Sequence, residues 1–65
     1  MNMGARIKKA RKNAGMTQAD LAGCLAITRE HLVYIENGQK SPSIALLRNI
    51  AKATGVKATD LLGDD

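Results

Sequence analysis

The chain has 65 residues, a formal net charge of +4 at pH 7 and 45% apolar residues, with one Tyr and no Trp or Phe. A chain of this length allows one small domain, because it buries only about 60% of the surface that its unfolded form exposes. β-branched and aromatic residues are too scarce for several alternating strands, so a β-sandwich or barrel is not expected. We therefore expect residues 1–65 to form a single all-α domain.

The cysteine content and the hydropathy indicate a location. One cysteine, Cys24, cannot form an internal disulfide and fits a reducing cytosol, so we expect a cytoplasmic protein. The longest aliphatic run covers residues 44–47, whereas a membrane span needs about 20 residues. No apolar segment follows the basic N-terminal residues, so we expect neither a signal peptide nor a membrane-bound chain.

Positive charge is concentrated near the N-terminus. Half of the ten Lys and Arg residues precede the first acid, Asp20. These five are Arg6, Lys8, Lys9, Arg11 and Lys12. Such a patch predicts an anionic partner, with nucleic acid as the first hypothesis and an anionic membrane surface as the second. The apolar face of this segment is too poor for strong insertion into a membrane, so we favour nucleic acid.

Helix-end signals predict five short helices. The first covers about residues 3–13 and ends near Gly15. Its apolar stripe is Ile7, Ala10 and Ala14, and Lys8, Lys9 and Lys12 face away. The second opens at Thr17, which forms a capping box with Asp20, and ends near Leu25.

Hydrophobic staples mark three of the helix starts. The staple pairs are Met16 with Leu21, Ile27 with Leu32, and Val56 with Leu61. They predict helix starts at Thr17, Thr28 and Lys57. The last is the weakest, since Lys57 cannot cap as Thr does and its charge opposes the helix dipole. Between the last two starts, a helix from Ser43 to about Thr54 follows Pro42. Its inward residues are Ile44, Leu47, Ile50 and Ala51.

Only a tight turn separates the second helix from the third, which is typical of a helix-turn-helix. Residues 17–38 read TQADLAGCLAITREHLVYIENG, and are followed by PSI at 42–44 and IAKATGV at 50–56. Over residues 7–62 the chain resembles the phage repressor and Cro type of helix-turn-helix, also called the XRE family. The resemblance implies a compact five-helix, lambda-repressor-like domain that binds duplex DNA and regulates transcription, usually as a two-fold dimer. Two positions depart from the family pattern, which commonly has Gly in place of Ala26 and Ser in place of Lys57.

The third helix is expected to read bases. At about 100° per residue, Leu32 and Ile35 face the core. Four residues face outward, namely Glu30, Val33, Tyr34 and Asn37, and Arg29 and His31 flank them. Such a helix fits the major groove, where its first turn comes closest to base edges. We predict that Arg29, Glu30, Val33 and Tyr34 contact bases.

The chemistry of three of these side chains suits particular partners. Arg29 can pair with guanine, Glu30 can accept from cytosine N4, and Tyr34 can contact a thymine methyl group or a phosphate. Each has a plainer interpretation. Arg29 can simply be solvated, Glu30 can be an acid favoured by the helix dipole, and Tyr34 can be a half-packed surface residue. His31 is interpreted as a partly packed polar residue.

Other residues are expected to hold the DNA backbone or the fold. The resemblance places Gln18 against a phosphate at the start of the second helix. We also expect Thr28, at the start of the third helix, to contact the DNA backbone. Asn37 and Lys40 suit phosphate contacts that fix the register without reading sequence. Arg11 and Glu36 stand at the margins of apolar stripes, and the resemblance implies that they form an ion pair between the first and third helices.

The remaining function classes are weaker. Cys24, His31 and Asp20 match no zinc signature, and so small a domain leaves little room for a substrate pocket. We expect no enzyme, metal, cofactor or small-molecule substrate, and interpret Cys24 as a small buried hydrophobe. An antitoxin or adaptor module for protein interaction is the alternative, and it predicts an apolar or acidic outward face on the third helix. We expect a homodimer on a palindromic operator, joined through the C-terminal part, where only one of Leu61 and Leu62 can readily turn inward.

Overall fold

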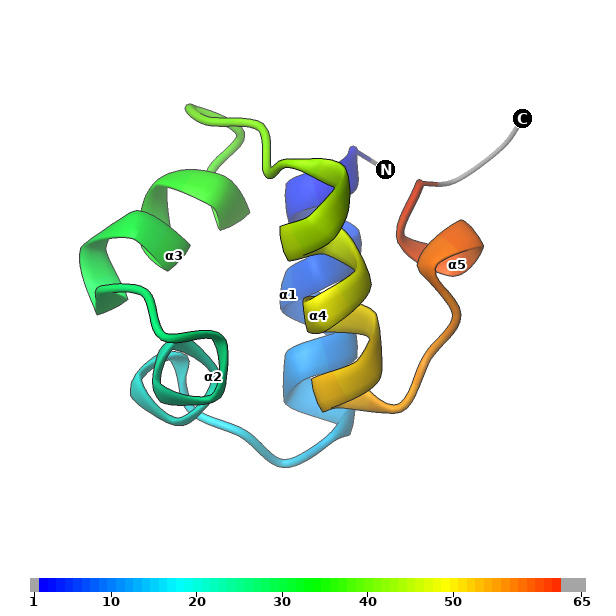
Figure 1. The fold of residues 1–65 in the computed structure, drawn as a ribbon, viewed down its shortest axis with the longest axis horizontal. Helices are drawn as coiled ribbons and strands as arrows, with labels where there is room; N and C mark the ends of the chain where they lie inside the picture. Colours follow the sequence, from blue (N-terminus) through cyan, green and yellow to red (C-terminus); the bar gives the residue numbers. More distant parts are fainter. Residues whose placement is uncertain (1, 63–65) are drawn as a thin grey trace.

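The computed structural model describes residues 2–62, in which five helices and no strand are present (Figure 1). The helices are α1 (Met3–Asn13), α2 (Gln18–Leu25), α3 (Arg29–Glu36), α4 (Ile44–Thr54) and α5 (Ala58–Leu62). The expected all-α fold is confirmed, and the helices begin and end within a residue or two of their predicted positions. No helix in this part of the chain has the length and apolar character that crossing a membrane requires.

The helices pack around a central pair. In Figure 1, α1 and α4 run through the middle of the molecule, α2 and α3 lie on one side, and α5 lies on the other. α3 packs against α1 and α2, α4 packs against α2 and α5, and α1 also contacts α4 and α5. Because α1 and α2 support α3 from behind, the opposite face of α3 is left outward.

Within the described residues, the core consists of aliphatic side chains, with no aromatic residue among them. Six large ones are almost completely buried: Ile7, Leu21, Leu32, Ile35, Ile50 and Leu61. Full burial of each contributes roughly 1.5–3 kcal/mol of transfer free energy. The buried alanines Ala10, Ala22 and Ala51 allow the helices to approach closely. All buried side-chain nitrogen and oxygen atoms of residues 2–62 have hydrogen-bond partners.

A glycine that sequence analysis did not single out sets the spacing between α1 and α3. A Cβ atom on Gly4 would lie 2.5 Å from the carbonyl oxygen of Glu36 and 2.6 Å from that of Ile35. Both are backbone atoms, which cannot move aside as a flexible side chain can. A glycine inside a helix is a weak signal of such close packing.

The N-caps predicted at Thr17 and Thr28 are confirmed, and Ser43, predicted only as the start of its helix, is a third N-cap. The hydroxyls of Thr17, Thr28 and Ser43 each accept a hydrogen bond from the backbone N–H three residues later. At Thr17 the capping box is complete, since its own N–H donates to the Asp20 carboxylate at 3.1 Å. This hydrogen bond, together with the interaction of the carboxylate with the Thr17 side chain, lowers the pKa of Asp20. The cap therefore stabilises the fold above the ordinary pKa of Asp, and this contribution is lost as the pH falls through the lowered value.

The start of α5 confirms the expected weakness of Lys57 as a cap. Its side chain offers no acceptor, and only the reciprocal bond forms, from the Lys57 N–H to the Asp60 carboxylate at 3.3 Å. The staple residues are in place, since Met16, Ile27 and Val56 pack half-buried against the core.

The turn between α2 and α3 contains the one non-glycine residue with positive φ among residues 2–62. Ala26 has φ 57° and ψ 39°, the left-handed conformation that the family's glycine suggested. The Ile27 N–H closes the turn by donating to the Ala22 carbonyl at 3.1 Å. After α1, α3 and α4 the corresponding left-handed residues are Gly15, Gly38 and Gly55.

Three predicted burials are wrong. Ala14 is exposed because it is the C-cap of α1, where the chain turns away from the core. Ile44 is 63% exposed, since it is the first residue of α4 and lies beyond the packed part of the stripe of Leu47, Ile50 and Ala51. Cys24 is exposed because the buried stripe of α2 is formed by Leu21, Ala22 and Leu25, which leaves it outside the core.

Candidate nucleic-acid interface

The outward face of α3 is the part of the molecule that suits DNA. Leu32 and Ile35 are buried beneath it, at 0% and 1% exposure. Of the predicted outward and flanking residues, Arg29, Glu30, Tyr34 and Asn37 are exposed, while His31 and Val33 are half-buried. One short helix thus combines an apolar underside with a polar, partly aromatic outer face.

Arg29 and Glu30 form the exposed first turn of α3. Thr28 is the exposed N-cap of α3, and both side chains follow it directly in the sequence. Within the described part of the chain, neither side chain forms a hydrogen bond or an ion pair, so the guanidinium and the carboxylate keep their full hydrogen-bonding capacity for a partner. A guanidinium offers a fork of donors and a carboxylate offers acceptors only.

Tyr34 and Lys40 are brought together by the loop after α3. The Lys40 ammonium lies 5.6 Å from the centroid of the Tyr34 ring, which is the single aromatic side chain in the sequence. The sequence pattern predicts a base contact for Tyr34 and a phosphate contact for Lys40, without linking the two residues. The sequence does not predict their contact, because it depends on how the loop folds back on α3. The only signal in the sequence is that the two residues are close together along the chain.

Gln18 and Thr28 begin α2 and α3. The side-chain amide of Gln18 donates to Glu36 Oε1 at 3.1 Å, which leaves its second amide hydrogen for another acceptor. The Thr28 hydroxyl accepts from the His31 N–H at 3.1 Å, which leaves its own hydrogen to donate. Asn37 is the exposed C-cap of α3. Each of these side chains retains a donor that can face solvent.

Arg11 and Glu36 form a buried ion pair behind this face. Arg11 Nε donates to Glu36 Oε2 at 2.7 Å, and Nη2 donates to Oε1 at 3.3 Å. Arg11 Nη1 also donates to the Met16 carbonyl at 2.9 Å, and Gln18 completes the group on Glu36. Arg11 and Glu36 are only 7% and 6% exposed. The network joins α1, α2 and the loop between them to the end of α3, and so holds the outward face in place.

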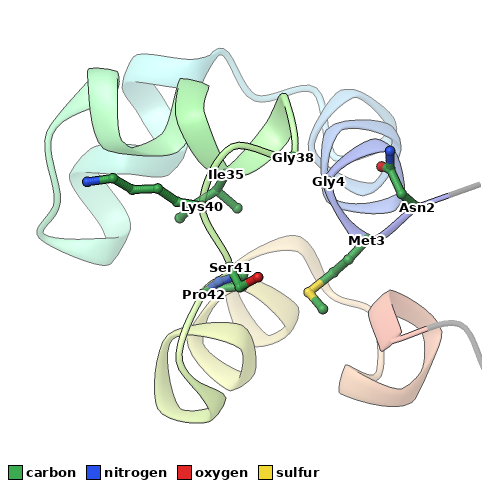
Figure 2. A pocket seen from close by; sticks show the side chains of 8 residues that line it. All are labelled: Asn2, Met3, Gly4, Ile35, Gly38, Lys40, Ser41 and Pro42. Atoms are coloured by element: carbon green, nitrogen blue, oxygen red, sulfur yellow. The ribbon is translucent and has the colours of Figure 1, made fainter.

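Two open hollows lie away from the outward face of α3. One of about 210 Å³ lies beside the start of α1, and Figure 2 shows the side chains around it. The other, of about 360 Å³, lies between α1 and α5. Residues 2–62 contain no group of three His, Cys, Asp or Glu side chains that could hold a metal ion.

Comparison with known proteins agrees with this geometry. A family model described as helix-turn-helix matches residues 7–61. The immunity repressor protein of Bacillus phage phi105 is 34% identical over 65 residues, which are all of this chain and 45% of that protein. The chain thus spans less than half the length of this relative.

Two solved structures have the same fold. The P22 c2 repressor in complex with a synthetic operator superposes with a TM-score of 0.90 at 26% identity, over 100% of this chain and 98% of that chain. SinR, the master regulator for biofilm formation, in complex with DNA superposes with a TM-score of 0.86 at 31% identity, over 94% and 98% of the two chains. The chain belongs to the helix-turn-helix family of the phage repressor and Cro type.

Proposed function

We propose that this chain is a sequence-specific, double-stranded DNA-binding regulator of transcription that inserts α3, with its caps at residues 28 and 37, into the major groove. The observation that supports this proposal most directly is the outward face of α3. Arg29, Glu30 and Tyr34 are exposed on it, and Leu32 and Ile35 are buried beneath it. The similarity to two repressor and regulator structures that contain operator or DNA supports the same function.

Arg29, Glu30, Val33 and Tyr34 contact base edges in this proposal. Arg29 donates to guanine O6 and N7, and Glu30 accepts from cytosine N4. Val33 is half-buried at the margin of the face and offers an apolar surface to a thymine methyl group. The absence of any hydrogen bond or ion pair on Arg29 or Glu30 in the described structure supports this assignment, because no intramolecular bond need be broken on binding.

Gln18, Thr28, Asn37 and Lys40 contact phosphates. Gln18 and Thr28 stand at the N-termini of α2 and α3, where backbone N–H groups and the helix dipole favour an anion. Each of the two side chains keeps one hydrogen for a phosphate oxygen after its intramolecular bond is made. These contacts fix the register of the protein on the duplex and carry no sequence preference of their own.

The functional unit on DNA is a symmetric homodimer. One recognition helix reads only a few base pairs, and a two-fold pair doubles the information. The operator is then an approximate palindrome with half-site centres about 10 base pairs, or about 34 Å, apart. Leu61 is 1% exposed and Leu62 is 48% exposed, which supports a dimer surface near the end of α5. So small a surface makes dimerisation weak until DNA is bound.

Selection of bound duplexes from a random library at physiological salt tests the function. We expect an approximately palindromic consensus bound by two subunits, and sedimentation counts them. If each subunit neutralises about three to four phosphates, log Kd against log salt has a slope of magnitude roughly 5 to 7. A slope near zero contradicts DNA binding. One subunit per duplex at saturation contradicts the dimer and the palindrome.

The outward face of α3 does not favour the alternative, an antitoxin or adaptor module for protein interaction. Such a module would present an apolar or acidic surface, whereas Arg29, Tyr34 and Asn37 are exposed here with Lys40 beside them. We also propose a cytoplasmic location, because a chain with a single cysteine cannot form an internal disulfide and suits a reducing compartment.

A further inference from the structure

The loop after α3 ties a predicted phosphate contact to a predicted base contact. The Lys40 ammonium lies 5.6 Å from the centroid of the Tyr34 ring, within the roughly 6 Å over which cation–π attraction acts. The backbone N–H groups of Gln39 and Lys40 both donate to the Tyr34 carbonyl, at 2.9 and 3.3 Å. The segment that carries the ammonium is therefore bonded to the residue that carries the ring.

The direction of the lysine side chain supports a role toward α3. Lys40 is one of the residues around the hollow beside the start of α1, yet its side chain runs from the loop back toward α3 and away from that hollow (Figure 2). The Lys40 ammonium lies over the Tyr34 ring, yet Tyr34 as a residue is 44% exposed, so part of it stays open to solvent. A partner that approaches the outward face of α3 can reach the open part.

We propose that Lys40 is a positioning residue for Tyr34, and that the positioned ring recognises the 5-methyl group of a thymine. This inference rests on the proposed DNA binding and deepens it. The ammonium holds the ring in one orientation, and the uncovered apolar surface of the ring then packs against a methyl group in the major groove. Preference for thymine at one position of the operator thus depends on a lysine that touches no base.

Removal of the ammonium should weaken this preference in particular. Without it, the ring of Tyr34 regains rotational freedom that binding must remove again. A phosphate contact from Lys40 would behave differently, because its loss lowers the affinity for thymine-containing and uracil-containing duplexes by the same factor. The ratio of the two affinities therefore separates a positioning role from a purely electrostatic one.

The experiment replaces each thymine of a selected duplex in turn with uracil, which lacks the methyl group. For the unmodified protein we expect about a fourfold loss at the position that Tyr34 contacts in each half-site, since burying one methyl group is worth about 0.8 kcal/mol and 1.4 kcal/mol is a factor of ten. Tyr34→Ala should abolish the loss at that position alone. Lys40→Met should reduce it, and Lys40→Arg should restore it, because a guanidinium also stacks on aromatic rings.

Lys9→Met is the matched control. Lys9 is exposed and lines the hollow between α1 and α5, so this variant loses the same charge far from Tyr34 and should keep the fourfold ratio. An unchanged ratio in Lys40→Met overturns the positioning role and makes Lys40 a phosphate contact only. An unmodified protein with no sensitive thymine overturns methyl recognition.

A second readout needs no DNA. Tyr34 is the single Tyr in a chain without Trp, so the intrinsic fluorescence of the protein reports on this ring alone. Quenching by acrylamide should increase in Lys40→Met and stay unchanged in Lys9→Met. Equal quenching in both variants overturns the positioning role. If the unmodified protein bound no duplex, the proposed function would fail, and the quenching result alone would decide whether Lys40 positions Tyr34.

Discussion

The polar group on the buried side of α3 is already paired, whereas the polar groups on the exposed side keep free donors and acceptors. Glu36 receives hydrogen bonds from two other segments and is 6% exposed. Arg29 and Glu30, on the same helix, are exposed and form no hydrogen bond or ion pair within residues 2–62. Substitutions on the buried side should therefore change the stability of the fold, and those on the exposed side should change DNA binding without unfolding the protein.

The largest effect is expected at the ion pair. Glu36→Gln should destabilise the fold by about 3 to 5 kcal/mol, because Arg11 is left as a buried charge without a counter-charge. Since so small a core rarely supplies more than about 5 kcal/mol, much of the variant should be unfolded at room temperature. Thermal melts measure this.

Glu30→Gln is the matched control, because it removes the same charge from the exposed side of α3. It should change the free energy of unfolding by less than about 0.5 kcal/mol. A midpoint shift of only a degree or so in Glu36→Gln would mean that the pair behaves as an exposed one, worth under about 1 kcal/mol.

The next effect is expected where α1 meets the end of α3. Gly4→Ala should destabilise by about 1 to 3 kcal/mol, because the new Cβ would overlap the carbonyl oxygens of Ile35 and Glu36. Gly23→Ala is the control on α2, where a Cβ meets no atom within 4 Å. It should stabilise by up to about 1 kcal/mol through helix propensity. Equal effects of the two variants in denaturant unfolding would contradict the close packing of α1 on α3.

On the exposed side, Arg29→Ala should cost about 1 to 3 kcal/mol on the selected site and relax the preference at one base position. The free energy of unfolding should change by less than about 0.5 kcal/mol, as for other exposed substitutions. Asn37→Ala should instead weaken the selected site and a random duplex by similar factors, because it removes a phosphate contact. Competition binding with single-base variants of the site distinguishes the two patterns, and a reversed result would exchange the two roles.

Gln18 contributes both to the buried network and to the surface proposed to bind DNA. Its amide donates to Glu36 in the buried network, while its remaining hydrogen is proposed to meet a phosphate. Gln18→Ala should therefore reduce stability by about 0.5 to 1.5 kcal/mol and also weaken selected and random duplexes alike. A variant with unchanged unfolding and weaker binding would mean that the bond to Glu36 adds nothing to stability.

The sequence predicts local features of this molecule well and contacts between distant segments less well. Thr17 and Thr28 cap their helices as expected, because capping depends on residues within one helical turn. Burial of Ile44 was mispredicted, because helical periodicity does not say where the packed part of a stripe ends. Gly4 was missed because its role depends on carbonyl oxygens more than 30 residues away.

The same distinction applies to the candidate site. The outward set on α3 follows from a count of about 100° per residue, and its exposed members follow that count. The contact between Lys40 and Tyr34 depends on the path of the loop after Gly38, which no periodic pattern encodes. Which bases the side chains contact is a property of the complex with DNA, so those roles stay predictions.

The smallest effect is expected at Ala26, in the turn that leads into α3. Its left-handed conformation strains an L-residue with a Cβ, so Ala26→Gly should stabilise by up to about 1 kcal/mol. The added freedom of glycine in the unfolded chain opposes this gain, and a loss of similar size would mean that the turn has adapted to alanine. Ala19→Gly, at an exposed position in α2, is the control and should destabilise by about 1 kcal/mol. Denaturant midpoints with unchanged slopes give the sign. Because Ala26 lies outside both faces of α3, the preference among single-base variants of the selected site should not change, and a changed preference would mean that the turn also sets the angle at which α3 meets the groove.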